Sequence, residues 1–372
     1  GETFLAKRTI KSTESYLKNS VNMNIYVLCY FVISSFLLDR RLNKKILGLS
    51  YIGALLIFLF MALRYGYGND YFNYAALHAS YHDYGVGKFS FESFYKEINL
   101  LSPNFQFVVL TQSLFFMSAF LVLGKALRRL ECNLSLVALL VFLNPYLYLI
   151  HLTAIRQSMA ICIFVLFVSL FLMYRRYLFI VLAITLPMLF HKAALVYLVS
   201  IPLLIFIERI YAARWHHKIL YSAVTIYLIY LILEVGMSGI LGKYNVYIER
   251  SLGGPISITT LLYVVWLSFL FLTSKPRKAL DGESERIYTT LHALVFLSLI
   301  LSTFSIFFPH FSRITLFFDF FIPFYFACSR FVIPRYFAYI SLVSIYLIRN
   351  YTFLSTEIYG VGFGTYRIFL FP

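Results

Sequence analysis

Two short polar clusters interrupt the long apolar stretches of this 372-residue chain, and their residue types suit the binding of an anion. The first, residues 64–71, holds Arg64, two glycines and one acidic residue. Gly66 and Gly68 permit tight turns that can bring main-chain N–H groups close to an oxyanion. Asp70 could accept a proton from a hydroxyl group, or it could orient Arg64. The simpler alternative is a solvated turn held by a salt bridge.

The second cluster, residues 151–157, places an arginine and a glutamine at the start of an apolar run. The planar guanidinium of Arg156 suits phosphate oxygens, and a nearby helix start would add the attraction of the helix dipole for an anion. His151 lies five residues before Arg156, so the two would not share a face of a continuous helix. A helix break near Thr153 could bring them together. The alternative is an interfacial arginine that reaches to lipid headgroups.

Other polar residues lie beside or within later apolar runs. His191 lies between two runs, and it could be a base or simply a hydrogen-bonded turn residue. Arg313 precedes an aromatic-rich run and is a second candidate phosphate clamp, while His310 is a candidate base near neutral pH. Glu234 and Asp319 fall within predicted spans, a costly position for an acid unless it anchors an arginine or lines a wet cavity.

His78 and His82 lie four residues apart, a spacing that could hold a metal ion on a helix. No third ligand lies at a convincing distance, so we interpret them as a surface pair. The four cysteines form no CxxC pair and are interpreted as core residues. No metal or other cofactor is predicted.

The composition places these clusters in an integral membrane protein. The chain is 61% hydrophobic and only 13% charged, whereas about a quarter of the residues of soluble domains are charged. Apolar runs of roughly 17–22 residues indicate helices rather than barrel strands. We predict an all-α polytopic membrane protein with about 12 transmembrane helices in one domain, residues 23–372. Residues 1–22 are polar and are interpreted as an N-terminal extension or a cloning remnant. The predicted spans are residues 24–38, 46–63, 105–123, 133–150, 158–174, 177–190, 193–208, 219–239, 257–273, 287–308, 315–332 and 336–348.

The distribution of basic residues predicts the topology. When successive loops are assigned to alternate sides, one set holds 18 of the 32 Lys and Arg residues and the other holds ten. The positive-inside rule places the first set in the cytoplasm, so both polar clusters and both termini face outward. The net charge of +16 therefore reflects topology rather than nucleic-acid binding. In the outward tract, large apolar residues at helical spacing predict an amphipathic helix near residues 91–101 along the membrane surface.

The polar clusters resemble the motifs of the EpsG-like and Wzy-like polysaccharide polymerases, and the likeness covers nearly the whole chain after Met23. The matching residues are Arg64, Gly66, Asp70 and Tyr71 in the first motif, His151, Arg156 and Gln157 in the second, Phe190 and His191 in a third, and the late Arg313. Gly68 is an addition to the first motif.

The resemblance implies a multi-pass, metal-independent, GT-C-like glycosyltransferase of the bacterial inner membrane, with its active site on the periplasmic or outer face. Such polymerases make O-antigen, capsule or exopolysaccharide by moving a growing glycan from one undecaprenyl pyrophosphate carrier onto a repeat unit held on another. The implied partners are the undecaprenyl-pyrophosphate-linked oligosaccharide and membrane lipids. A chain-length regulator protein is a candidate partner, and nucleic acid is not expected.

The chemistry of this transfer divides the candidate residues into two groups. The leaving pyrophosphate gains charge in the transition state, and fixed guanidinium groups can stabilise it without a metal. A base takes the proton of the acceptor hydroxyl. We assign binding of pyrophosphate and glycan to Arg64, Tyr71, Arg156, Gln157, His310 and Arg313. The candidate bases are Asp70, His151 and His191. Within the first group, Arg156 and Arg313 would bind the pyrophosphate and Arg64 and Gln157 would support them.

Two other functions remain open. A flippase or transporter of the lipid-linked oligosaccharide would use the same outward cations, but it needs a charged path across the membrane, and few charges lie within the spans. An O-antigen ligase-like transferase would use the same donor with lipid A–core as acceptor. Its large outward loop late in the chain is missing here.

Overall fold

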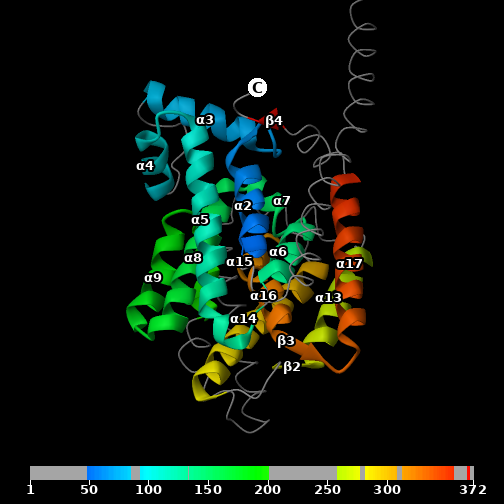
Figure 1. Cartoon of the computed structure of the whole chain (residues 1–372). Helices are drawn as coiled ribbons and strands as arrows, with labels where there is room; N and C mark the ends of the chain where they lie inside the picture. Colours follow the sequence, from blue (N-terminus) through cyan, green and yellow to red (C-terminus); the bar gives the residue numbers. More distant parts are fainter. Residues whose placement is uncertain are drawn as a thin grey trace, which may run out of the picture. The chain divides into compact units, whose positions relative to one another are not determined.

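The computed structural model describes residues 48–84, 93–132, 134–200, 258–276, 281–307, 312–355 and 367–368. Over these residues the fold is all-α, with 13 α-helices, two short 3₁₀-helices and four strands of two or three residues (Figure 1). The helices form because the apolar runs are rich in Leu, Ile, Phe and Ala, and a helix satisfies its own backbone hydrogen bonds in an apolar medium. The chain divides into two compact units.

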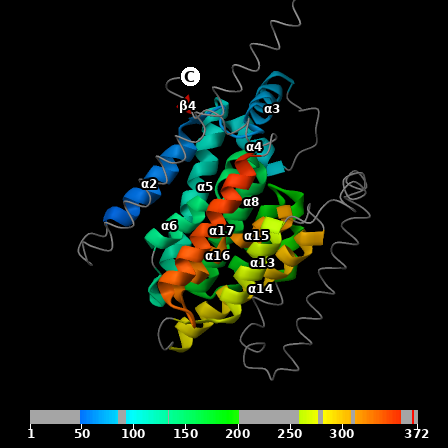
Figure 2. The ribbon, with the colours of Figure 1, turned by 90° about the vertical axis from the view of Figure 1, so that its right-hand side faces the viewer.

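Unit 1 comprises Gly1–Met117, Leu134–Met159 and Tyr346–Pro372. Within it α3 and α4 pack together beyond the N-terminal end of α5, and α2 packs on α6 (Figures 1 and 2). Strand β1 pairs antiparallel with β4, with Arg64 opposite Ile368. The elements that contribute to this unit are α2 (Gly48–Ala62), β1 (Arg64–Tyr65), α3 (Tyr71–Tyr84), α4 (Ser93–Leu101), α5 (Phe105–Ala126), α6 (Leu134–Leu143), α7 (Leu149–Thr153), α8 (Ile155–Tyr174), α17 (Arg335–Ser355) and β4 (Arg367–Ile368).

Unit 2 comprises Ser118–Asn133 and Ala160–Ile345, so α5, α8 and α17 contribute residues to both units. Here α14 packs against α13, α15 and α16, and β2 pairs antiparallel with β3. Its further elements are η1 (Arg128–Leu130), α9 (Tyr177–Met188), η2 (Lys192–Val199), α13 (Ile258–Leu272), β2 (Ser274–Pro276), α14 (Gly282–Phe307), α15 (Ser312–Asp319), α16 (Phe321–Cys328) and β3 (Ser329–Phe331).

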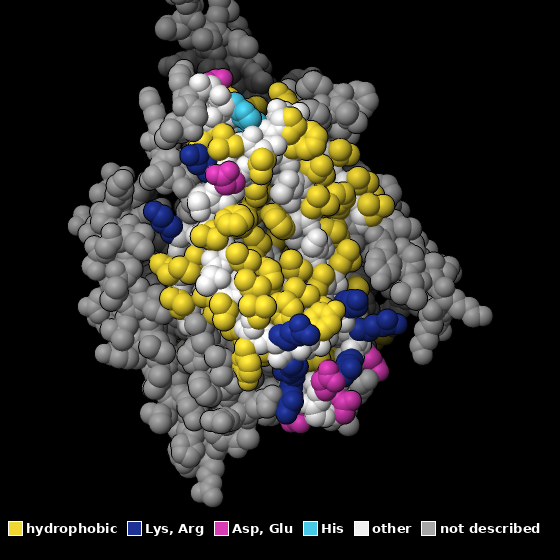
Figure 3. Space-filling model, turned by 90° about the vertical axis from the view of Figure 1, so that its left-hand side faces the viewer, with side chains coloured by type: hydrophobic (Ala, Val, Ile, Leu, Met, Phe, Trp, Pro, Cys, Tyr) yellow, Lys and Arg dark blue, Asp and Glu magenta, His cyan; other side chains and the backbone are white. Residues whose placement is uncertain are grey.

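Three described helices are long and apolar enough to cross a membrane: Phe105–Ala126, Ile155–Tyr174 and Gly282–Ile306. Figure 3 shows one face on which hydrophobic side chains cover a broad area, while most of its Lys, Arg, Asp and Glu side chains gather at one end. The charged residues of η1 and of the start of α14 are exposed. This segregation is the pattern of a protein whose apolar surface faces lipid and whose helix ends face water.

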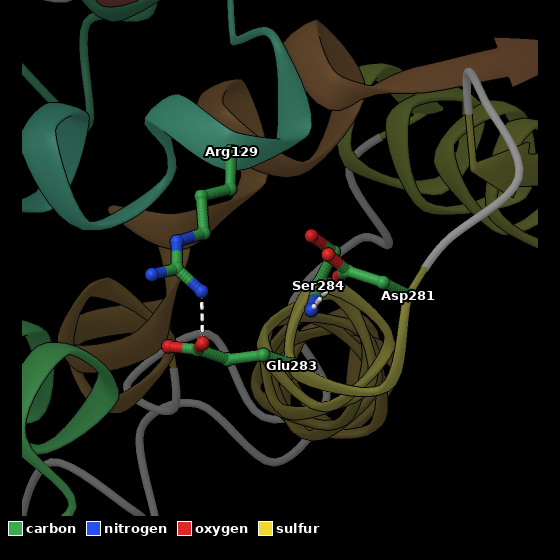
Figure 4. Close-up of polar contacts among 4 residues, drawn as sticks. All are labelled: Arg129, Asp281, Glu283 and Ser284. Carbon is green, nitrogen blue, oxygen red and sulfur yellow. Dashed lines mark hydrogen bonds and ion pairs between the residues drawn. The ribbon is translucent and has the colours of Figure 1, made fainter.

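The start of α14 illustrates how such an end is built. Asp281 caps the helix, because its Oδ1 accepts a hydrogen bond from the backbone N–H of Ser284 at 2.8 Å (Figure 4). Glu283 in the first turn forms an ion pair with Arg129 of η1. Both side chains are largely exposed, so the pair contributes about 0–1 kcal/mol.

Most predicted spans within the described residues are helices, but two of them are broken. The predicted span 133–150 ends as α6 at Leu143, because Pro145 lacks an N–H and restricts the residue before it. The predicted span 315–332 divides into α15 and α16, since Pro323 cannot donate a hydrogen bond to the carbonyl of Asp319. It also ends early, as residues 329–331 form β3 rather than helix.

Further predictions have different outcomes. The described part of the predicted span 193–208 is the 3₁₀-helix η2 rather than an α-helix. The predicted helix near 91–101 is α4, where Tyr95 and Asn99 are buried. Residues 1–22, the predicted spans 24–38 and 219–239, and two candidate residues, Glu234 and His310, lie outside the described residues.

Candidate functional site

Arg64 lies just beyond the end of α2 and is completely buried. Its Nη1 donates to the carbonyl of Met61 at 2.9 Å. Its Nη2 donates to Gln112 Oε1 at 2.7 Å and to the carbonyl of Leu152 at 3.3 Å. The Met61 carbonyl belongs to the last turn of α2, whose carbonyls have no helical donor. Arg64 therefore caps one helix and joins it to α5 and α7.

Gln112 is a site residue that the sequence did not indicate as functional. It lies within α5 and is completely buried. Its Nε2 donates to the carbonyl of His151 and, at 2.9 Å, to Ser158 Oγ. The available signal was an amide in the middle of an apolar helix, a position that usually requires a hydrogen-bonding partner. Gln112 links the first polar cluster to the second.

The structure has a helix break near Thr153, but the break does not bring His151 and Arg156 together, as it could have done. Helix α7 ends at Thr153, Ala154 has φ −92° and ψ 70°, and α8 begins at Ile155. The break brings His151 Nδ1 to 2.8 Å from Ser158 Oγ, a pair seven residues apart in sequence. Arg156, in the first turn of α8, instead lies near the rings of Tyr74 and Tyr95.

His151 is almost completely buried, on a short helix outside the three candidate spans. Burial lowers its pKa to about 3, because the charged imidazolium loses its hydration. Its Nδ1 is already engaged with Ser158. A ligand therefore meets His151 less readily than it meets the partly exposed Asp70.

Gly68 fits closely against the second cluster. It has φ +113°, and a Cβ added there would lie 2.9 Å from the Leu152 carbonyl oxygen. Only glycine permits both this backbone angle and this approach. The Gly68 backbone thus packs against α7 near the point where Arg64 donates to the same carbonyl.

Arg156 forms the centre of an aromatic cluster in unit 1. Its Cζ lies 5.9 Å from the ring centroid of Tyr74 on α3 and 6.0 Å from that of Tyr95 on α4. Burial raises the pKa of Tyr74, while the charge of Arg156 and a hydrogen bond with it oppose the rise, and the nearby charge of Asp70 adds to it. Burial also raises the pKa of the completely buried Tyr95 well above its usual range. An arginine, an acidic residue and two tyrosines therefore lie together.

Asp70 precedes the first turn of α3. Its carbonyl accepts from the N–H of Tyr74 at 2.9 Å, and its Oδ1 accepts from Asn73 Nδ2 at 3.4 Å. Asp70 is partly exposed, and its carboxyl group can be reached from solvent. Tyr71, predicted to bind glycan, is buried, and its hydroxyl donates to Gln106 Oε1 at 3.2 Å. Gln157 is buried as well.

His78 and His82 hold α4 against α3 and so position Tyr95. His78 Nδ1 lies 3.3 Å from Asn99 Oδ1, and His82 Nε2 lies 3.1 Å from the carbonyls of Asn99 and Ser102. The prediction of a surface pair is wrong for His78, which is buried because α4 covers it. Among the described residues, no group of three or more His, Cys, Asp or Glu could hold a metal ion.

The remaining candidates lie in unit 2. His191 precedes η2, and its ring stacks on Phe317 of α15 with centroids 6.1 Å apart. Arg313 is in the first turn of α15, four residues before Phe317. Asp319 is buried and accepts hydrogen bonds from the hydroxyls of Ser298 and Thr315. The acid is thus held by hydroxyl groups within the bundle.

A family model described as the EpsG family matches residues 47–366. The chain belongs to the EpsG family. Searches of curated proteins and of solved structures found no match. Membership of this family links the membrane protein to exopolysaccharide synthesis. The match includes residues of both units and all the described candidate residues.

In this EpsG family protein, the residues of the two polar clusters fall into a buried set and a partly exposed set. Arg64, Tyr71, His151 and Gln157 are buried. Asp70 and Arg156 are partly exposed. Asp70 and Arg156 are thus accessible from outside the fold, whereas the four buried residues pack within it.

Proposed function

We propose that this protein is a membrane glycosyltransferase that polymerises undecaprenyl-pyrophosphate-linked repeat units on the outer face of the membrane. The observation that carries the proposal is the position of Arg156 near the rings of Tyr74 and Tyr95 in unit 1, where the charge of Asp70 also acts on Tyr74. The guanidinium of an arginine is planar, and its N–H groups can donate to phosphate oxygens. The partly exposed ring of Tyr74 beside it offers an apolar face to a sugar.

The reaction needs a cation for the leaving group and a base for the acceptor. The acceptor hydroxyl oxygen forms a bond to the anomeric carbon of the donor glycan while the bond from that carbon to the pyrophosphate oxygen breaks. The electron pair of the broken bond stays on the pyrophosphate, where Arg156 stabilises the added charge. Asp70 takes the hydroxyl proton.

The other predicted residues have supporting or separate roles. Arg64 acts as a positioning residue, since its guanidinium donates hydrogen bonds to the Met61 and Leu152 carbonyls and to Gln112 Oε1. In unit 2, Arg313 and His310 are proposed to bind the pyrophosphate or glycan, and His191 is a candidate base. Polymerisation by a folded alanine variant of each residue tests these roles. We place the protein in the bacterial inner membrane, where a chain-length regulator is a proposed partner.

The test is polymerisation by the purified protein in detergent, with lipid-linked repeat units and without metal or nucleotide. A ladder of products on a gel that is lost in Arg156→Ala supports the proposal. Arg129→Ala is the matched control, because it removes an exposed arginine from η1 and should leave the ladder unchanged. No ladder, together with movement of the same lipid between liposome leaflets, would instead establish a flippase. Transfer onto lipid A–core alone would establish a ligase.

A further inference from the structure

Gln112 uses both amide N–H groups and its carbonyl oxygen to join three separate segments. The oxygen accepts from Arg64, 48 residues away in sequence, at 2.7 Å. The N–H groups donate to the carbonyl of His151, which precedes the helix break, and to Ser158 Oγ, which follows it. One side chain therefore spans the break between α7 and α8.

The hydrogen bonds are directional and require an amide. Arg64 has only donors, so its partner must accept, while the carbonyl of His151 needs a donor. A carboxylate at position 112 could accept from Arg64 but could not donate to the His151 carbonyl. An apolar side chain of the same length could do neither, and it would leave buried polar groups unpaired.

The Gln112 amide also constrains Ser158. Because Ser158 Oγ accepts from Gln112, its own hydroxyl hydrogen can donate to His151 Nδ1, 2.8 Å away. Ser158 lies two residues after Arg156 on the same helical turn. A side chain that fixes both ends of the break thus sets where the first turn of α8 lies, and with it where Arg156 meets Tyr74 and Tyr95.

We propose that Gln112 is a positioning residue for the transfer reaction, and that it acts by holding the α7–α8 break so that Arg156 lies at the reacting pyrophosphate. This inference rests on the proposed function. It predicts that changes at Gln112 lower kcat more than they raise KM, since a misplaced Arg156 loses contact mainly with the charge that develops in the transition state.

The test measures kcat and KM of polymerisation, and thermal unfolding, for Gln112→Met, Gln112→Glu and Ser158→Ala. We expect kcat of Gln112→Met to fall about 100-fold, because a displacement of about 1 Å can have such an effect. Ser113→Ala is the matched control: it removes a buried hydroxyl from the next position of α5, whose hydrogen bond goes to Val109 of the same helix. It should keep wild-type kcat.

A double-mutant cycle separates positioning from a general loss of structure. If Gln112 acts through Arg156, then Arg156→Ala should lower kcat much less in the Gln112→Met protein than in the wild type. Where Gln112→Met does not fold, Ser158→Ala replaces it in the cycle, since it removes only part of the contact. Additive effects, or wild-type kcat in Gln112→Met, overturn the inference but leave the proposed function intact. A wild-type protein that forms no polymer overturns both.

Discussion

Arg64 and Arg156 both lie at the ends of apolar helices in unit 1, yet their surroundings differ. Arg64 is completely buried and donates to three protein oxygens on α2, α5 and α7. Arg156 is partly exposed and lies near the rings of two tyrosines close to an acidic residue. Two arginines from neighbouring motifs can thus divide the work, one organising the backbone and the other meeting the ligand.

The largest expected effect is that of Arg64→Ala on stability. Removal of the guanidinium leaves buried oxygens of Met61, Gln112 and Leu152 without their donor, at about 1–3 kcal/mol for each unpaired group. We expect a greatly reduced melting temperature in detergent and loss of activity with it. Arg129→Ala, which breaks an exposed ion pair, should change stability by about 1 kcal/mol or less. Equal losses of stability in Arg64→Ala and Arg129→Ala would show that the buried hydrogen bonds of Arg64 do not stabilise the fold.

Arg156→Ala should have the opposite profile. We expect polymerisation to fall by about 100-fold or more, the usual effect of removing one group that stabilises transition-state charge. The melting temperature should stay close to that of the wild type, because Arg156 is only partly buried. Arg156→Lys should recover part of the activity, since it keeps the charge but not the planar fork. If Arg156→Ala unfolded the protein, Arg156 would have a structural role like that of Arg64.

Gly68→Ala tests whether the two clusters depend on close packing. The added Cβ would lie 2.9 Å from the Leu152 oxygen at a φ of +113°, so we expect a loss of about 1–3 kcal/mol of stability. Gly282→Ala is the matched control, because a Cβ there has no atom within 4 Å. Chemical denaturation of both variants measures the difference. Equal stability would show that the contact of Gly68 with α7 is not required.

Tyr74→Phe keeps the ring near Arg156 and removes its hydroxyl. Because that hydroxyl hydrogen bonds with Arg156, we expect kcat to fall by about tenfold, corresponding to one hydrogen bond to a charged group. Tyr177→Phe alters an exposed tyrosine of α9 and should be neutral. An unchanged kcat in Tyr74→Phe would limit the role of α3 to ring stacking.

The smallest effect concerns pH and the packing of α4 on α3. Burial lowers the pKa of His78 below its usual 6.5, so the folded protein binds fewer protons at this site than the unfolded chain. Stability from this site is therefore present above pH 6.5 and is lost as pH falls below that value. Melting temperatures from pH 7.5 to 5.5 measure it, and His78→Gln should flatten the dependence. If the melting temperature of His78→Gln fell more steeply with falling pH than that of the wild type, the predicted direction of the His78 effect would be wrong.

Much of the fold was predictable because long apolar runs form helices in an apolar medium, where the backbone N–H and C=O groups must hydrogen bond with one another. The breaks were harder, since Pro145 and Pro323 each lie inside a run whose average hydropathy stays high. The break near Thr153 was predictable only because His151 and Arg156 needed it to meet, whereas the structure uses it to join His151 to Ser158. A break at this position was thus considered from the sequence, but for a contact between His151 and Arg156 rather than between His151 and Ser158.

The candidate site was predicted in its charged residues but not in its supports. Asp70 and Arg156 stand out in sequence because charge is rare here. Gln112, Tyr74 and Tyr95 do not, since their roles depend on contacts between distant segments, such as the 48 residues between Arg64 and Gln112. From the sequence, Arg64 was assigned a supporting role and Arg156 the pyrophosphate, but sequence spacing alone could not show that Arg64 is buried and Arg156 partly exposed.

The most direct test of the central claim is the affinity of the protein for undecaprenyl pyrophosphate in detergent. We predict that Arg156→Ala binds this carrier at least about tenfold more weakly than the wild type, the expected loss for one charge-assisted hydrogen bond, with an unchanged melting temperature. Arg129→Ala should bind as the wild type does. Wild-type affinity in a folded Arg156→Ala protein would contradict the account, because the pyrophosphate would then be bound elsewhere.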